Sequence, residues 1–290
     1  MKINFINKRL LKSMTLFGAW VISSFCYSAA IDQITDNNTA YLLYSVPNKI
    51  ERYDLVNGQA LDSISLAQET SAFAIDGDTA YVAYNRELRE IDMNSGDSVF
   101  IKNFPDNIKG IEVIGDNLYV FTPTGYDGTL TVINKLDNTL VEEAEPRQHA
   151  DYFGSSDTAI FYRSQGVSPS DIHKIEVNLD GTLGAHTESP YHGDYANADE
   201  VWLDADQVRV FDDSGTVYFT ENLNYAGSLG GSFDTITFVK GNPVIARGSE
   251  LFLFTSHLIE QGSTVIQWAP SYLASYENNV FAFTLDASDF

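Results

Sequence analysis

Polar turns and short apolar strands alternate along this chain in a unit that recurs about every 40 residues. The unit is clearest at residues 38–44, where Asn-Thr precedes an apolar run, and at residues 78–84, where Asp-Thr precedes another. Further copies begin at Asp116, Asp157, Asp206, Gly241 and Asn278. Short apolar runs bounded by Asn, Asp and Gly are typical of buried β-strands. The pattern therefore predicts a chain built from repeated strands.

Each unit holds three further strands. A second strand follows the first at residues 49–55, 87–93, 129–134 and 173–177. A turn rich in Asn and Gly comes next, because these residues accept the positive φ of tight hairpins. A third strand closes the unit, as at residues 60–66 and 98–101. An apolar strand also precedes each unit, as at residues 72–75 and 110–114.

Four antiparallel strands in about 40 residues is the period of a β-propeller blade. One blade cannot cover both of its faces, so neighbouring blades must cover them. An immunoglobulin-like array would need units of about 100 residues, and only residues 256–261 resemble a helical turn. The sequence predicts an all-β propeller with six full blades and a partial seventh, of the seven-bladed type.

The last unit, residues 271–290, supplies only two strands. One alternative is that the seventh blade is completed beyond Phe290, in a longer protein with further domains. The other is that the final strands pair with an N-terminal strand at residues 31–35. The first unit already looks complete, and an open strand edge promotes aggregation, so the pattern favours a propeller truncated at its C-terminus.

The first thirty residues have the features of a secretory signal peptide. A basic segment comes first and contains Lys2, Lys8, Arg9 and Lys12. An apolar run follows at residues 14–25, and the small residues Ser28 and Ala30 come after it, as a signal peptidase site requires. We predict cleavage after residue 30, which leaves residues 31–290 as the propeller domain. The exported protein would be periplasmic, attached to the cell surface or extracellular.

Two alternatives to cleavage are weaker. The apolar run is short for a transmembrane anchor. Cys26 raises the alternative of a lipoprotein, but the residue before it is the large Phe25, where such signals need a small one. Because Cys26 is the only cysteine, cleavage leaves no thiol, disulfide or cysteine-ligated metal site.

Charge excludes one class of partner. The chain has 17 Lys+Arg against 40 Asp+Glu, a formal net charge of −23. Removing residues 1–30 takes away four basic residues and no acidic one, which leaves 13 against 40, a formal charge of −27. Such a surface repels phosphate, so we expect no nucleic-acid partner.

The repeat resembles a known family. Leu118-Tyr119-Val120, followed by Gly-Thr-Leu-Thr-Val-Ile-Asn-Lys-Leu-Asp-Asn-Thr-Leu-Val at residues 128–141, resembles the repeat of YVTN-type propellers, and residues 52–58 resemble an element of quinoprotein-like propellers. The resemblance covers most of residues 37–145 and fades after residue 185. Residues 166–194 are similar to propeller regions of large exported bacterial proteins of unknown function, and the chain as a whole resembles the N-terminal propeller of such a protein. The resemblance implies architecture far more strongly than chemistry.

The quinoprotein likeness raises pyrroloquinoline quinone as a cofactor. Family members that bind it carry a docking motif ending in T-G-x-x-x-W. No Trp follows the turns of this chain at that spacing, and its three tryptophans are Trp20, Trp202 and Trp268. We therefore do not expect this cofactor.

Acidic residues gather near residues 194–213, and four of them are candidate metal ligands: Asp194, Asp199, Asp204 and Asp206. Oxygen-rich loops of exported proteins can bind Ca²⁺, so calcium is the candidate ion. No D-x-D-x-D-G loop is present, however, and Asp is common at turns. A solvated loop between two blades is the alternative.

Loop residues supply the candidate ligand-binding set, which comprises Tyr126, Tyr191, His192 and Tyr195. Tyr152 and Tyr225 are further tyrosines expected outside the strand cores. Loops of a propeller carry function, and Tyr is a strong contact residue for proteins and glycans. The five histidines show no H-x-H or H-x-x-x-H spacing, so a polar loop role is the alternative for His192.

Catalytic motifs are absent from the sequence. It contains no G-x-S-x-G, no P-loop and no G-x-G-x-x-G. The prediction is a non-catalytic binding or scaffold module for a protein or glycan ligand. The alternative is a propeller-type enzyme, either a metal-dependent lactonase or hydrolase or a quinone-linked oxidoreductase, which would need carboxylates and histidines from several strands to converge.

Overall fold

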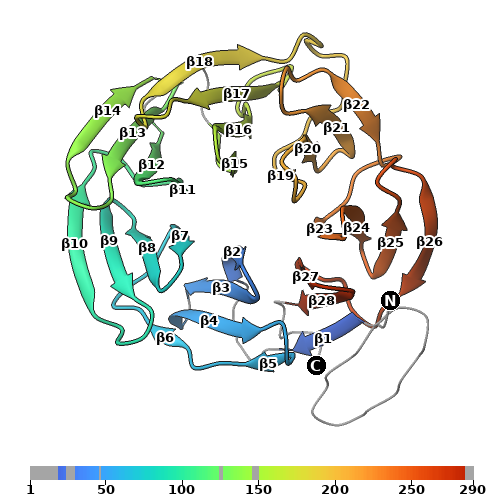
Figure 1. Ribbon diagram of the computed structural model, residues 1–290, viewed down its shortest axis with the longest axis horizontal. Helices are drawn as coiled ribbons and strands as arrows, with labels where there is room; N and C mark the ends of the chain where they lie inside the picture. The colour runs from blue at the N-terminus through green and yellow to red at the C-terminus, as the bar shows by residue number, and fades with distance from the viewer. Residues whose placement is uncertain (1–18, 24–29, 46, 124–126, 146–149, 285–290) are drawn as a thin grey trace. The chain divides into compact units, whose positions relative to one another are not determined.

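The computed structural model describes residues 19–23, 30–45, 47–123, 127–145 and 150–284. Every regular element in these ranges is a β-strand (Figure 1). The chain divides into two compact units, one formed by Gln68–Gly227 and the other by Met1–Ala67 with Ser228–Phe290. No helix among the described residues is long and apolar enough to cross a membrane.

The unit Gln68–Gly227 contains four four-stranded sheets, each with its strands in sequence order. Blade 2 has β7 (Ala72–Asp76), β8 (Thr79–Tyr84), β9 (Glu87–Asp92) and β10 (Ser98–Asn103). Blade 3 has β11 (Gly110–Ile114), β12 (Asn117–Thr122), β13 (Thr129–Asn134) and β14 (Leu140–Ala144). Blade 4 has β15 (Phe153–Ser156), β16 (Ala159–Arg163), β17 (Ile172–Val177) and β18 (Leu183–Glu188). Blade 5 has β19 (Val201–Leu203), β20 (Arg209–Asp212), β21 (Thr216–Phe219) and β22 (Tyr225–Ser228).

The other unit holds the remaining sheets. Blade 1 has β2 (Ala30–Asp36), β3 (Thr39–Ser45) and β4 (Asn48–Asp54), with β5 (Gln59–Ala60) and β6 (Ile64–Ser65) both paired to β4. Blade 6 has β23 (Thr235–Val239), β24 (Asn242–Arg247), β25 (Glu250–Phe254) and β26 (Glu260–Val265). The partial seventh sheet has β27 (Tyr272–Tyr276) and β28 (Asn279–Thr284), with β1 (Ala19–Ser23) parallel to β28.

The predicted fold class is confirmed, since the protein is an all-β propeller with six full blades and a partial seventh. Three details differ from the sequence prediction. The expected strand at residues 60–66 is divided into β5 and β6, and the helical turn suggested at residues 256–261 is a non-helical turn at residues 256–258, followed by β26 from Glu260. The strand at residues 31–35 belongs to β2 and pairs with β3, and β28 pairs with β1 inside the predicted signal segment.

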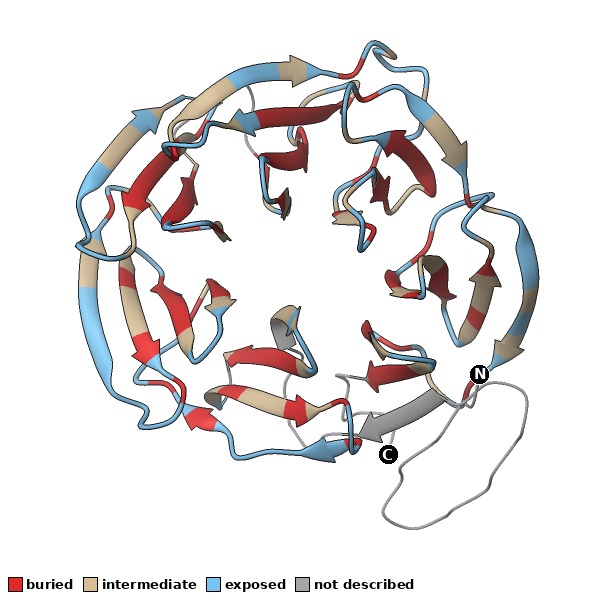
Figure 2. Ribbon diagram, in the orientation of Figure 1, coloured by how far each residue is buried: buried red, intermediate tan, exposed pale blue. Residues whose placement is uncertain are grey.

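Burial explains why each unit begins with a continuous apolar run. All six residues of β12 are buried, and in β8 only the first is not, because neighbouring blades cover both faces of a middle strand. The last strand of a blade is much less covered than the middle strands. Three consecutive residues of β10, Ser98, Val99 and Phe100, are exposed, as the pale blue outer strand in Figure 2 shows.

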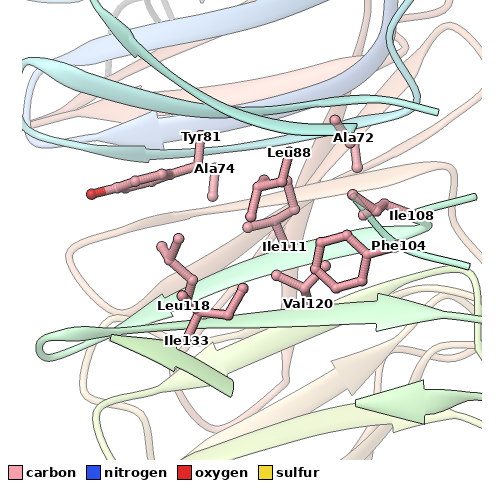
Figure 3. Close-up of a cluster of buried hydrophobic side chains, with 11 residues drawn as sticks. Ala72, Ala74, Tyr81, Leu88, Phe104, Ile108, Ile111, Leu118, Val120 and Ile133 are labelled. Atoms are coloured by element: carbon pink, nitrogen blue, oxygen red, sulfur yellow. The ribbon is translucent and has the colours of Figure 1, made fainter. Parts of the chain in front are cut away.

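The interface between blades 2 and 3 is a continuous apolar core. Leu88, Leu118, Val120 and Ile133 are all at most 1% exposed and pack against one another with Phe104 and Ile108 (Figure 3). Removing apolar surface of this kind from water is a main source of folding stability.

We expect Ile133→Val to lower the free energy of unfolding by about 1 kcal/mol, because it removes one methylene from this close-packed interface. Ile259→Val is the matched control, since Ile259 is 65% exposed and loses almost no packing. Urea denaturation of the two variants measures the difference. Equal effects would show that the blade 2–blade 3 interface is not packed as described.

Candidate functional site

One loop, residues 189–200, joins blade 4 to blade 5 and carries three of the four predicted ligand-binding residues. Tyr191 and Tyr195 lie partly buried against the core between these blades, while His192 is exposed between them in sequence. The fourth, Tyr126, lies outside the described residues. The loop therefore carries Tyr191, His192 and Tyr195 close together in the chain, and their role in ligand binding stays a prediction.

Tyr195 is the centre of a group that we call the tyrosine cluster, made of Tyr191, Tyr195, Tyr218 and Tyr225. Its ring stacks on Tyr225, with centroids 5.2 Å apart and planes at 7°. The rings of Tyr191 and Tyr218 meet it edge-on, at 5.2 and 5.9 Å. The Tyr225 backbone N–H donates to the Tyr191 hydroxyl at 3.2 Å. With Tyr225 42% exposed and Tyr218 buried, the cluster forms a supported aromatic surface.

A buried ion pair lies behind this surface. Arg163 ends β16 and Asp212 ends β20, and Arg163 Nη1 is 3.4 Å from Asp212 Oδ2, with both side chains at most 2% exposed. Arg163 Nη2 donates to the carbonyl of Ser170 at 2.7 Å and to that of Ala196 at 3.0 Å. Its Nη1 also reaches the Tyr218 hydroxyl at 3.4 Å. One guanidinium thus fixes two loops and one ring of the cluster.

Burial raises the pKa of Asp212 to about 6, although the positive charge of Arg163 and a hydrogen bond from Ser214 oppose the shift. Its Oδ2 has no hydrogen-bond partner within the described part of the chain, so desolvation is only partly offset. Burial also raises the pKa of the Tyr218 hydroxyl, and the Asp212 charge raises it further. The cluster therefore rests on a phenol and a carboxyl whose pKa values are both raised by burial.

We expect Asp212→Asn to change how stability depends on pH. Because the pKa of Asp212 is raised from 3.8 to about 6 in the folded state, the folded protein binds the proton more tightly. Wild type should therefore gain stability relative to the variant as pH falls through 6. From pH 7.5 to 5 the gain is about 1.4 kcal/mol. Urea unfolding at both pH values measures it, and a constant difference would contradict the raised pKa.

The four predicted metal ligands do not form one group. Asp204 is buried and accepts the backbone N–H groups of Val208 and Arg209 at 2.9 Å and Arg209 Nε at 2.8 Å. Asp206 is exposed in the same turn. The backbone N–H of Asp199 donates to Asp213 at 2.8 Å, and that of Asp194 donates to the Tyr191 carbonyl at 3.1 Å. The Asp204 side chain is thus used within its own turn, and a calcium site at these four residues stays a prediction.

Another set of side chains does converge. Among the described residues, Asp171, Glu188 and His192 are the group whose possible metal-ligand atoms all lie within 4.8 Å of one another. His192 Nδ1 is 2.7 Å from Asp171 Oδ2 and 3.5 Å from Glu188 Oε1. Of the three, the sequence had singled out only His192. The pairing of β17 with β18 places Glu188 opposite His173, two residues after Asp171.

The same strand pairing joins two histidines that the sequence had left apart. His173 Nδ1 lies 3.2 Å from His186 Nε2, and the Tyr162 hydroxyl lies 3.0 Å from the same nitrogen. The rings of Tyr162 and His173 are stacked, with centroids 5.0 Å apart. Spacing motifs cannot reveal such a pair, because its members come from two strands whose register is not visible in the sequence.

The chain matches no protein-family model and no curated protein in sequence. Solved structures do match. A computationally designed protein, Ika8, is 14% identical with a TM-score of 0.63, covering 90% of this chain and 94% of that one. Kuenenia stuttgartiensis hydrazine synthase is 12% identical with a TM-score of 0.62, covering 87% and 91%. KlHsv2 with its loop 6CD replaced by a Gly-Ser linker is 10% identical with a TM-score of 0.65, covering 87% of each chain.

These similarities define the class of protein as a β-propeller and nothing finer. An enzyme and a designed protein share the fold at comparable TM-scores, so the architecture does not select an activity. The function must be argued from the tyrosine cluster and from the groups around it.

Proposed function

We propose that the protein is an exported, non-catalytic binding or scaffold module that holds a protein or glycan ligand at the tyrosine cluster. The observation that carries this proposal is the stack of Tyr225 on Tyr195, with Tyr225 exposed and the ring beneath it held by Tyr191 and Tyr218. A rigid, partly exposed aromatic surface binds at low entropic cost.

The composition supports a neutral or basic ligand. A formal net charge of −23 disfavours phosphate-rich polymers and favours partners that complement an acidic surface. The signal-like segment at residues 1–30 supports a location in the periplasm, at the cell surface or outside the cell. The repeat at residues 118–141 supports kinship with YVTN-type and quinoprotein-like propellers, and with it a place at the N-terminus of a larger exported protein.

Ligand capture tests the proposal. The purified chain would be applied to an array of surface glycans and, separately, immobilised for capture of proteins from an envelope extract, with each hit confirmed by titration of the purified ligand. We expect one saturable ligand whose binding is weakened when Tyr225 of the tyrosine cluster is replaced by Ala. Hits that bind the Tyr225→Ala variant as well as the wild type would contradict the proposed site.

The second candidate function is that of a metal-dependent lactonase or hydrolase. The observation that favours it is the approach of two carboxylates and an imidazole at Asp171, Glu188 and His192. A panel of lactone and ester substrates, assayed with and without added Zn²⁺, separates the candidates. Turnover by the wild type that disappears in His192→Ala would support the enzyme. A wild-type protein that binds its ligand but turns over none of these substrates would support the binding module.

A further inference from the structure

We propose that Asp171, Glu188 and His192 bind a divalent transition-metal ion of the Zn²⁺ type, which fixes the loop that carries Tyr191 and Tyr195. The metal site stands on its own geometry and does not depend on the identity of the ligand proposed above. It is also distinct from the acidic segment that the sequence suggested for calcium.

The spacing of the three groups suits a small ion. In a tetrahedral site with bonds of about 2.0–2.1 Å, neighbouring ligand atoms lie about 3.3 Å apart. The Nδ1 of His192 is 3.5 Å from Glu188 Oε1, close to that separation. Its 2.7 Å distance to Asp171 Oδ2 is that of a hydrogen bond, which an entering ion would replace by a small outward shift of the imidazole.

The charge balance at Asp171 points independently to a cation. Its carboxylate is 6% exposed, and within the described residues the basic side chain that lies within 4.0 Å of it is His192. Imidazole is charged only when protonated, so Asp171 and Glu188 lack a permanent positive partner. Burying a carboxylate without one is costly. A divalent ion would supply that charge to both carboxylates.

The surrounding backbone holds the buried ligand in place. The Gly193 N–H donates to Asp171 Oδ1 at 3.3 Å, which leaves Oδ2 directed to His192. Gly193 has φ +73°, and a Cβ there would lie 3.1 Å from Pro169 Cγ, so this close turn needs glycine. Asp171 is therefore oriented by a second contact, as metal ligands commonly are.

The ligand types indicate the class of ion. Calcium and magnesium take oxygen ligands, and an imidazole nitrogen disfavours both. One nitrogen and two carboxylate oxygens suit Zn²⁺ or a similar ion, with a further position open to water or to an external ligand. His192 is 70% exposed, so that position faces solvent. Because His192 directly follows Tyr191, bound metal would join the loop at residues 189–200 to Asp171, just before β17, and to Glu188, at the end of β18.

The test is calorimetric titration of the full-length, metal-stripped chain with Zn²⁺ and, separately, with Ca²⁺. We expect one Zn²⁺ per chain, weaker binding of Ca²⁺, and a melting point that rises with Zn²⁺ and falls again with EDTA. His192→Ala and Glu188→Gln, both at exposed side chains, should each weaken Zn²⁺ binding at least about tenfold while the circular dichroism spectrum stays unchanged.

Asp206→Asn is the matched control, because it removes an exposed carboxylate from the acidic segment that the sequence suggested instead. We expect its Zn²⁺ affinity to equal that of the wild type. The proposal is overturned if no Zn²⁺ binds, if His192→Ala binds it as tightly as the wild type, or if Asp206→Asn abolishes binding. Tighter binding of Ca²⁺ than of Zn²⁺ would overturn the assignment to a transition metal.

Discussion

Replacing Arg163 by Met should lower the free energy of unfolding at pH 7.5 by about 3–5 kcal/mol, the largest effect we expect from any substitution discussed here. The change leaves Asp212, which is fully buried, without the charge that faces it at 3.4 Å. It also removes the hydrogen bonds to the carbonyls of Ser170 and Ala196. Each buried acceptor left unsatisfied adds to the cost.

The free energy of unfolding lost in Arg163→Met should be smaller at acid pH. Arg163 lowers the pKa of Asp212, so its removal raises that pKa further, and the proton that neutralises the buried carboxylate binds at a higher pH. Destabilisation caused by the bare charge is therefore relieved as pH falls, while the loss of the two carbonyl partners remains. Urea unfolding of Arg163→Met at pH 7.5 and pH 5 would show this difference.

Arg89→Met is the matched control for charge and length. Arg89 pairs with Glu87 on β9, where both side chains are about 30% exposed. Pairs of this kind contribute under about 1 kcal/mol. If Arg163→Met cost no more than Arg89→Met, the buried pair would not hold blades 4 and 5 together as we describe.

Replacing Tyr225 by Ala should weaken ligand binding about 30-fold, the equivalent of about 2 kcal/mol. Tyr225 is the exposed ring of the tyrosine cluster and stacks directly on Tyr195. Its removal takes away contact area and opens one face of Tyr195 to water. Titration of the captured ligand measures the effect, and Tyr225→Phe, which keeps the ring, should retain most of the affinity.

Tyr152→Ala provides the matched control, because Tyr152 is 47% exposed and is not a member of the tyrosine cluster. We expect it to change affinity less than about twofold. Equal losses from Tyr152→Ala and Tyr225→Ala would show that tyrosines contribute generally and that the cluster has no special role.

The fold was predictable because the apolar strand runs and the repeat of about 40 residues point to the same architecture. The apolar runs at residues 38–44 and 78–84 became middle strands that are buried on both faces, which is why they are continuous and not alternating. The strand expected at residues 60–66 is interrupted in the structure. Arg52 Nε donates to the carbonyl of Asp62, and the chain leaves the sheet between β5 and β6. A single side-chain contact of this kind has no signature in the repeat.

The candidate site was predictable only in part. Loop tyrosines could be recognised by residue type, and Tyr191 and Tyr195 do meet. Asp171 and Glu188 come together only through the pairing of β17 with β18, and strand register is not visible in one sequence. Asp204, which the sequence suggested as a calcium ligand, pairs with Arg209, five positions along the chain, and accepts a backbone N–H group of its own turn. Calcium binding there stays a prediction.

Hydrogen exchange of the protein with and without its captured ligand tests the central claim most directly. Slower exchange should appear in peptides that cover residues 189–200 and 220–228, which carry Tyr191, Tyr195 and Tyr225, while blades 2 and 3 stay unchanged. Protection confined to other segments, with these two exchanging at their free rates, would contradict a binding surface at the tyrosine cluster.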